Sequence, residues 1–375
     1  MLKGMHLTLL IGPAVPVPVP RVVLDALTAV EVTTSAGSAS GFQLTFTLSN
    51  RSPLETLFLL SGGAAIPLIR VIIVVTLNGM PEVLMDGVMT NHQIAPGGDG
   101  GHATLTVTGE DLTRVMDYID FSGVPYPAMP VEARVALIVA KYAAFGLAPL
   151  VVPSVLVDVP IPVDRIPRQA GTDLAYVRQL ADEAGYVFYV EPGPAPGASL
   201  AYWGPEIKVG APQPALNLDM DAYTNVESLT FTFDNTARAL PVLFVQNQAT
   251  KVPIPIPVPD VGLLDPPLGL IPPIPNRIEP ITGLAKLSPI QAALRGLARA
   301  ARSSDAVTGT GTLDVLRYGR ILKARRLVGV RGAGMAFDGL YYVKSVTHGI
   351  KRGEFKQRFT LSRNGLVSTL PRVPV

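Results

Sequence analysis

The chain has 375 residues, of which 16% are charged and 48% are hydrophobic. This length suffices for two or more domains with their own cores. The absence of cysteine excludes disulfides, thiolate metal sites and a cysteine nucleophile. The four histidines stand singly, without the spacing of a zinc enzyme, so neither a metal nor another cofactor is expected.

A hydrophobic content this high indicates either that the protein enters a membrane or that other chains bury much of its apolar surface. Two apolar stretches approach the length of a membrane span, but residues 54–77 are interrupted by Pro67 and Arg70, and residues 142–163 contain four prolines and Asp158. No integral membrane segment is expected. The first residues lack a convincing signal peptide as well. We therefore expect synthesis in the cytoplasm and burial of apolar surface by assembly.

Charge is unevenly distributed along the chain. From residue 295 onward there are 16 Lys and Arg against four acids, whereas the preceding residues carry 15 bases and 25 acids. A basic end can face an acidic partner or nucleic acid. Solvated strand faces, or complementarity between copies, are favoured here because no aromatic residues alternate with the basic ones. No stable nucleic-acid partner is expected.

The first part of the chain indicates β-structure. A short strand and alternating prolines open it, and this proline pattern requires polyproline II or a sheet edge. Strands are predicted over residues 24–34, 42–48, 81–93 and 103–108, with a bulge at Gly87. Residues 71–77 are apolar almost throughout, as in a strand covered on both faces. A helix is expected to begin at Leu112, after Glu110 and Asp111.

The middle part combines helices and strands. Residues 130–145 have helical periodicity and end at Gly146, and a second helix is predicted from Thr172 as N-cap to Gly185. Strands follow over residues 186–191 and 200–203. The adjacent acids Asp182 and Glu183 point about 100° apart on this helix, which favours a solvated face over acid–base chemistry.

Residues 226–234 alternate as a strand, with residues 241–246 expected as its neighbour. Residues 251–284 then contain ten prolines among apolar side chains. So much proline argues against ordinary sheet or helix, and so much Val, Ile and Leu argues against a solvated linker. We expect an ordered loop packed on a neighbouring chain, followed by a helix over residues 290–302.

Residues 340–366 predict a closing hairpin, with its turn at Gly349 and residues 351–353 and its return strand at residues 355–361. This return strand is similar to an earlier segment. Residues 41–50 and 354–363 share five positions of ten, Phe42/Phe355, Phe46/Phe359, Thr47/Thr360, Leu48/Leu361 and Ser49/Ser362. The match indicates two copies of one β-rich unit, although two amphipathic strands can also converge on such a pattern.

Three stretches together, residues 171–190, 312–334 and 337–366, resemble the baseplate hub proteins of contractile tails. This group includes the phage late-control D proteins and the N-terminal part of VgrG spikes. The resemblance implies a mainly β (α+β) fold with two tube-like β-barrel domains and interposed helix-containing elements. We assign residues 1–125 to the first barrel, 126–222 to the α+β part, 223–366 to the second barrel with an insertion at 251–284, and 367–375 to a tail.

The same resemblance implies a non-enzymatic function as a tube-to-spike adaptor in a phage tail or phage-like injection particle. The expected partners are two sister chains in a homotrimeric ring with pseudo-sixfold symmetry, the tail tube protein, the spike protein and other baseplate proteins. Because the sequence ends at Val375 without further strands, the spike is expected to be a separate polypeptide. Two alternatives stay open, a tail-tip cell-wall hydrolase and a carbohydrate- or receptor-binding β protein with Trp203 as its platform.

Two sets of residues are predicted to act through packing. The aromatic residues expected in the barrel walls are Phe42, Phe46, Tyr341, Tyr342, Phe355 and Phe359. The residues expected to contact a protomer or the spike are Pro253, Pro255, Pro257, Pro272 and Pro273.

Overall fold

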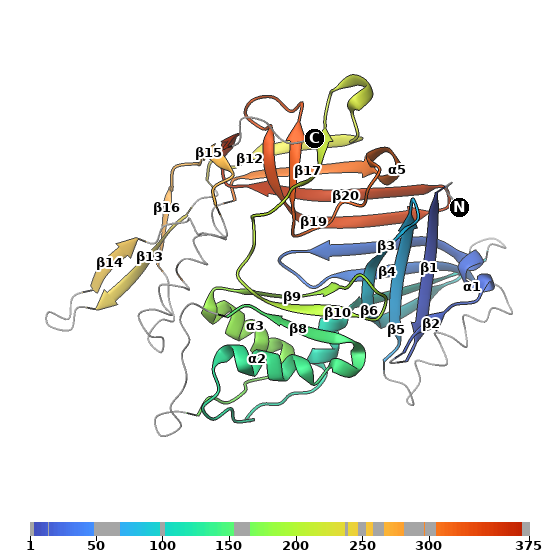
Figure 1. Ribbon diagram of the computed structural model, residues 1–375, viewed down its shortest axis with the longest axis horizontal. Coiled ribbons are helices and arrows are strands. Elements are labelled where there is room, and N and C mark those ends of the chain that lie inside the picture. The colour runs from blue at the N-terminus through green and yellow to red at the C-terminus, as the bar shows by residue number, and fades with distance from the viewer. Residues whose placement is uncertain are drawn as a thin grey trace.

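The computed structural model describes residues 4–13, 15–48, 68–97, 102–153, 166–236, 239–246, 253–257, 266–280, 296 and 305–369. Most of these residues lie in antiparallel strands, with a few short helices (Figure 1). The prediction of a mainly β fold is therefore confirmed. The helix predicted over residues 290–302 lies outside the described residues, except that Gly296 is helical.

The first part of the chain forms one antiparallel run of strands in the order β3-β4-β7-β6-β5-β1-β2. Its elements are β1 (Met5–Gly12), β2 (Val17–Pro18), α1 (Arg21–Ala26), β3 (Leu27–Ser35), β4 (Gly41–Leu48), β5 (Arg70–Leu77), β6 (Met80–Ala95) and β7 (Ala103–Asp111). Strand β5 is buried at seven of eight positions, as its continuous apolar sequence predicts.

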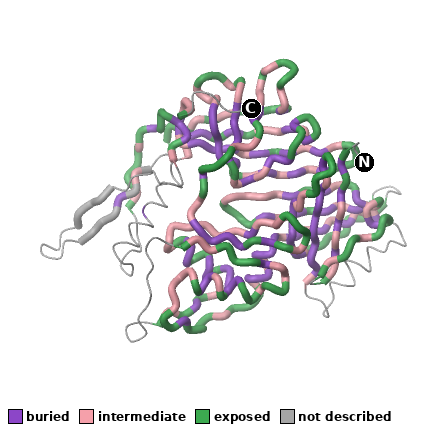
Figure 2. The backbone as a smooth tube through the Cα atoms, in the orientation of Figure 1, coloured by how far each residue is buried: buried purple, intermediate pink, exposed green. Residues whose placement is uncertain are grey.

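The last part of the chain extends the same sheet. Strand β3 pairs with β19, and the order continues β19-β20-β17-β12, with β18 and β11 branching from β19. The elements are β11 (Gln213–Asn217), β12 (Ser228–Phe233), β17 (Val307–Asp314), α5 (Val315–Tyr318), β18 (Leu327–Arg331), β19 (Gly339–Lys351) and β20 (Glu354–Arg363). One large hydrophobic core contains buried residues from both parts of the sheet (Figure 2).

A helix-containing part packs beside this sheet with a core of its own. It consists of η2 (Leu112–Asp117), α2 (Val131–Ala140), η3 (Ala143–Phe145), β8 (Leu147–Val151), α3 (Asp173–Ala184), β9 (Val187–Pro192) and β10 (Ser199–Gly204), and η4 (Asp221–Tyr223) follows. Helix α3 begins where Thr172 accepts from the backbone N–H of Ala175 and ends at Gly185 with φ 74°. Both limits agree with the prediction. The assignment of residues 126–222 to one domain stays a prediction.

A third group of strands comes from the proline-rich part. Strands β13 (Ala239–Gln246), β14 (Pro253–Pro257) and β16 (Arg277–Pro280) form a small sheet in the order β14-β13-β16. We call this sheet the arm, because β13 and β14 project from the rest of the molecule (Figure 1). Strand β15 (Gly269–Ile271) instead pairs with β21 (Leu366–Ser368) at the end of the described chain.

The arm corrects two predictions. Residues 251–284 do contain strands, because the prolines of β14 alternate with isoleucines. Alternate residues of an antiparallel strand direct their backbone nitrogens to the same side, so all three missing N–H donors can face away from β13. Residues 241–246 are not the neighbour of β12, which pairs with β17 instead. Nothing in a local alternation pattern specifies which distant strand it will meet.

Three local predictions were also wrong. Residues 24–26 belong to α1 rather than to a strand, since Pro20 precedes a short helix that buries Val23. Gly349 lies inside β19, paired with Lys356 and Glu31, and the turn is confined to the next residues. Gly87 is regularly paired on both sides and forms no bulge. A Cβ at that position would lie 2.2 Å from the carbonyl oxygen of Glu110, so close strand approach explains the glycine.

Candidate assembly surfaces

The predicted wall aromatics lie in two separate clusters. Five of them are no more than 4% exposed and belong to the large core, namely Phe42, Phe46, Tyr341, Phe355 and Phe359. Tyr342 points to the opposite face, as alternation along a strand requires. There it is 3% exposed and packs with a small cluster that includes Leu268 and Leu327.

The two similar strands occupy corresponding positions in the sheet. In the first copy, Val30 of β3 lies opposite Leu44 of β4. In the second copy, the residue aligned with Leu44 is Gln357, and it lies opposite His348. All four side chains are buried. A buried apolar pair in one hairpin is therefore replaced by a buried polar pair in the other.

Through Gln357, this polar pair is hydrogen-bonded to the loop that contains Leu322. The Oε1 atom of Gln357 accepts from the backbone N–H of Leu322 at 2.9 Å, and Nε2 donates to the Leu322 carbonyl at 2.8 Å. Nε2 also lies 3.1 Å from Nδ1 of His348. Burial lowers the pKa of His348 to about 4, so its imidazole is neutral at neutral pH and can accept this hydrogen bond.

A buried ion pair joins the first sheet to the helix-containing part. Arg70 donates from Nε and Nη2 to the two carboxylate oxygens of Asp86, each at 2.7 Å, and these side chains are 4% and 1% exposed. From the other part, Ser199 donates to Asp86 at 3.0 Å and the Gly197 carbonyl accepts from Arg70 at 3.2 Å. The sequence analysis treated Arg70 only as an interruption of an apolar stretch. The signal that it missed is an arginine on one strand followed by an aspartate on the next.

A second polar network orients the helices. Asp173, which is fully buried at the start of α3, accepts from Lys141 at 2.9 Å, Tyr142 at 2.8 Å and Gln169 at 2.7 Å. Tyr126 donates to the same Gln169 at 2.6 Å. By contrast, Asp182 is exposed on this helix. The inward carboxylate therefore has a structural function in packing.

A third charged group lies at the base of the second hairpin. Asp305 is 2.8 Å from the ammonium group of Lys344 and 3.6 Å from that of Lys208. Burial raises the pKa of Asp305, but the two ammonium groups outweigh this effect and hold the pKa below its ordinary value. Asp305 therefore carries a negative charge at neutral pH and holds two lysines.

The proline-rich part is anchored at one end and exposed beyond it. Asn364 accepts at Oδ1 from the backbone N–H groups of Leu268 and Gly269, at 3.0 and 2.9 Å, and Leu268 packs in the Tyr342 cluster. Of the predicted contact prolines, Pro272 is exposed and Pro273 is buried. The other three, Pro253, Pro255 and Pro257, lie on β14 at the edge of the arm.

The described part of the chain provides neither a metal site nor a membrane-spanning helix. No group of three His, Cys, Asp or Glu there could hold a metal ion. No helix there is long and apolar enough to cross a membrane. Trp203 is 0% exposed and packs in the core beside α3, so it does not form a platform for a sugar or receptor.

The fold of this mainly β chain is similar to that of solved phage tail proteins. A tail protein from Neisseria meningitidis MC58 aligns with 97% of this chain and 98% of its own, at 15% identity and a TM-score of 0.63. The 43 kDa tail protein of prophage MuSo2 from Shewanella oneidensis aligns over 96% and 98%, at 15% identity and a TM-score of 0.62.

The fold also occurs in VgrG-type assemblies. A chain of the half-lidded PdpA–VgrG complex of Francisella aligns with all of this chain and 60% of its own, at 10% identity and a TM-score of 0.61. The resemblance to the contractile-tail hub group is thus confirmed at the level of fold. No protein-family model matches the chain, and no curated protein sequence matches it either.

Proposed function

We propose that this protein is a structural baseplate hub, which joins the tail tube to the spike in a phage tail or a phage-like contractile injection system. The observation that carries the proposal is the fold match with the Neisseria tail protein over nearly the whole of both chains. The protein would act as a component of the assembled particle.

The proposed assembly is a homotrimer in which each chain contributes two tube-like barrels. Three chains would then present six barrels to the sixfold tube and a threefold platform to the spike. Two observations support burial of surface by sister chains and baseplate partners. The chain is 48% hydrophobic, and its proline-rich part exposes large aliphatic side chains.

Light scattering on the purified full-length chain, alone and with its tube and spike proteins, tests the proposal. We expect the chain alone to have the mass of a trimer. We expect the mixture to form one complex that contains the chain, the tube protein and the spike protein. A chain that stays monomeric beside both partners and cleaves peptidoglycan would instead favour the hydrolase alternative. Electron microscopy of particles from a producing strain should show the protein between tube and spike.

A further inference from the structure

Residues 270–278 expose an unusual amount of aliphatic surface. The exposed fractions of Leu270, Ile271, Ile274 and Ile278 are 62%, 55%, 83% and 67%. A single exposed aliphatic side chain is normal on a protein surface, but four within one short segment indicate a contact surface. We call residues 270–278 the proline ridge.

The backbone of the proline ridge is restrained before it meets any partner. Pro272, Pro273 and Pro275 fix φ near −65° and favour an extended polyproline II conformation. The ridge is also held at both ends, because Ile271 ends strand β15 and Arg277 begins strand β16. Proline-rich segments bind apolar grooves in this way, since little conformational entropy remains to be lost.

A groove of suitable size lies among β1, α1, β3 and the turn between β19 and β20. Its volume is about 340 Å³, and its apolar lining includes Leu7, Leu24, Leu27 and Ile350. A cavity of about 150 Å³ holds a benzene molecule, so this groove has room for two aliphatic side chains. We call it the hairpin groove.

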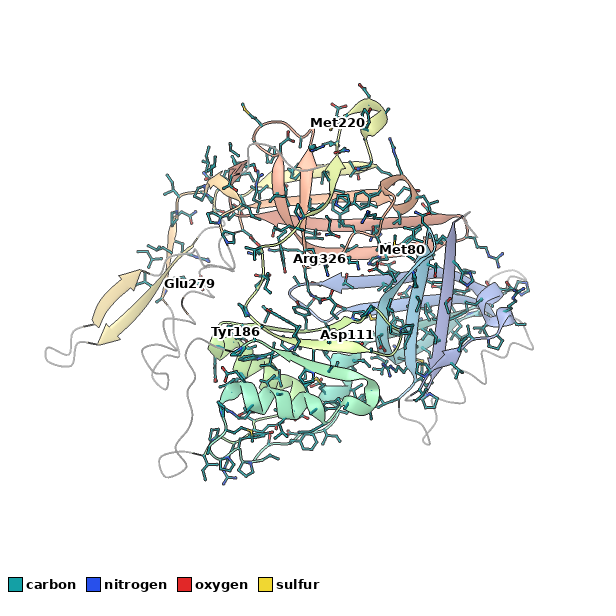
Figure 3. The ribbon with its side chains drawn as sticks, in the orientation of Figure 1. Met80, Asp111, Tyr186, Met220, Glu279 and Arg326 are labelled. Atoms are coloured by element: carbon teal, nitrogen blue, oxygen red, sulfur yellow. The ribbon has the colours of Figure 1, made fainter. Side chains whose placement is uncertain are left out.

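The two features lie at opposite ends of the molecule. In Figure 1 the arm projects at one end of the longest axis, whereas β1 and α1 lie at the other. Figure 3 likewise separates Glu279, on the arm, from Met80 at the start of β6. The ridge therefore cannot reach the groove of its own chain. A contact between different patches at opposite ends is a heterologous interface, which generates a ring when the rotation between copies closes.

Charges on the two surfaces are complementary. Arg277, whose side chain is 72% exposed, and Glu279 follow the ridge, while the groove is lined by exposed Asp25, Lys351 and Arg352. Arg277 and Glu279 lie 3.8 Å apart on the surface of the free chain. When Ile274 enters the groove, Arg277 can turn to Asp25 and Glu279 to the two basic residues. Such complementarity fixes the register of an interface.

We infer that the proline ridge of one chain occupies the hairpin groove of a second copy. This contact would close the homotrimer of the proposed function, on which the inference rests, and it names the surfaces that meet. The partner is a sister chain rather than the spike, because the groove that fits the ridge belongs to the same sequence.

Sedimentation of full-length variants tests the contact. Ile274→Asp should weaken self-association about a hundredfold, since an aspartate would have to enter an apolar groove. Met335→Asp is the matched control, because Met335 is 88% exposed outside both surfaces. Its association should equal that of the wild type. Arg277→Asp and Asp25→Arg should each weaken association about tenfold, and their combination should restore it.

Mixing two defective variants gives the sharpest result. Ile274→Asp keeps an intact groove, and Leu24→Asp keeps an intact ridge, so the mixture can form one proper contact but cannot close a ring. A complex of two chains, and not three, is expected. Asp25→Arg replaces Leu24→Asp if thermal unfolding shows that the latter is destabilised.

The possible failures are distinguishable. A wild-type chain that stays monomeric alone at about 100 μM overturns the inference. A wild-type trimer that Ile274→Asp leaves intact also overturns the inference. If that variant still forms a trimer but no longer binds the spike protein, the proline ridge contacts the spike instead. In both cases the hub proposal stands as long as the chain still joins tube and spike.

Discussion

The buried pair of Arg70 and Asp86 permits a quantitative test of how the helix-containing part is attached. Replacing either residue alone by an apolar one, Arg70→Met or Asp86→Leu, leaves an uncompensated charge between the two parts. Breaking a buried pair in this way costs about 3–5 kcal/mol of folding free energy. The double variant removes both charges. It should lose only about 1–2 kcal/mol, which corresponds to the hydrogen bonds that Ser199 donates to Asp86 and that Arg70 donates to the Gly197 carbonyl.

Urea unfolding followed by fluorescence is a suitable assay, since Trp203 is the only tryptophan and lies in the core of the helix-containing part. Lys323 and Glu82 form a matched surface pair, with side chains 41% and 28% exposed, and Lys323→Met should change stability by less than about 1 kcal/mol. Single variants at the buried pair that lose no more than this control would refute the reasoning. A double variant whose loss equals the sum of the single losses would refute it as well.

Three further predictions concern pH, strand packing and assembly. Because burial lowers the folded-state pKa of His348 to about 4, stability should be fully present above pH 6.5 and fall by about 3 kcal/mol as the pH drops to 4. His348→Val should remove that part of the slope in unfolding curves, and an unchanged slope would contradict the assignment. Gly87→Ala should cost about 3 kcal/mol or more, because its Cβ would meet the Glu110 carbonyl, whereas Gly37→Ala has open space and should cost less than about 0.5 kcal/mol in the same unfolding assay. Deleting residues 251–284 should reduce particle assembly while circular dichroism shows that the rest of the chain keeps its β-structure, and normal particles would disprove a contact function for this segment.

Local sequence signals predicted several elements well. These elements depend on neighbours within a few positions in the sequence. Examples are the continuous apolar residues of β5, the N-cap and C-terminal glycine of α3, and the alternation of β20. Such signals reflect backbone hydrogen bonding and the burial of one face, which short segments determine largely by themselves. The mainly β fold follows from them.

Long-range pairing was not predictable in the same way. Strand β13 was predicted as the neighbour of β12, yet it pairs with two segments of the proline-rich part. The polar joints were missed for a related reason. Arg70 and Asp86 are separated by 15 residues, and the sequence does not reveal that Ser199 meets them from another part of the chain. Both features depend on which surfaces meet, and no single segment determines that.

The hairpins that contain the two similar strands differ at one buried cross-strand pair. Val30 and Leu44 contribute only apolar packing to the first, so any pair of matching volume could replace them. At the corresponding positions, Gln357 binds both backbone groups of Leu322 and also contacts His348, and all of these side chains are buried. An unmatched donor or acceptor there would cost about 1–3 kcal/mol. The second hairpin thereby holds the loop that leads into β18. Lys323 on this loop forms an ion pair with Glu82 of β6. The buried polar pair of the second hairpin thus positions a loop that contacts the other part of the sheet.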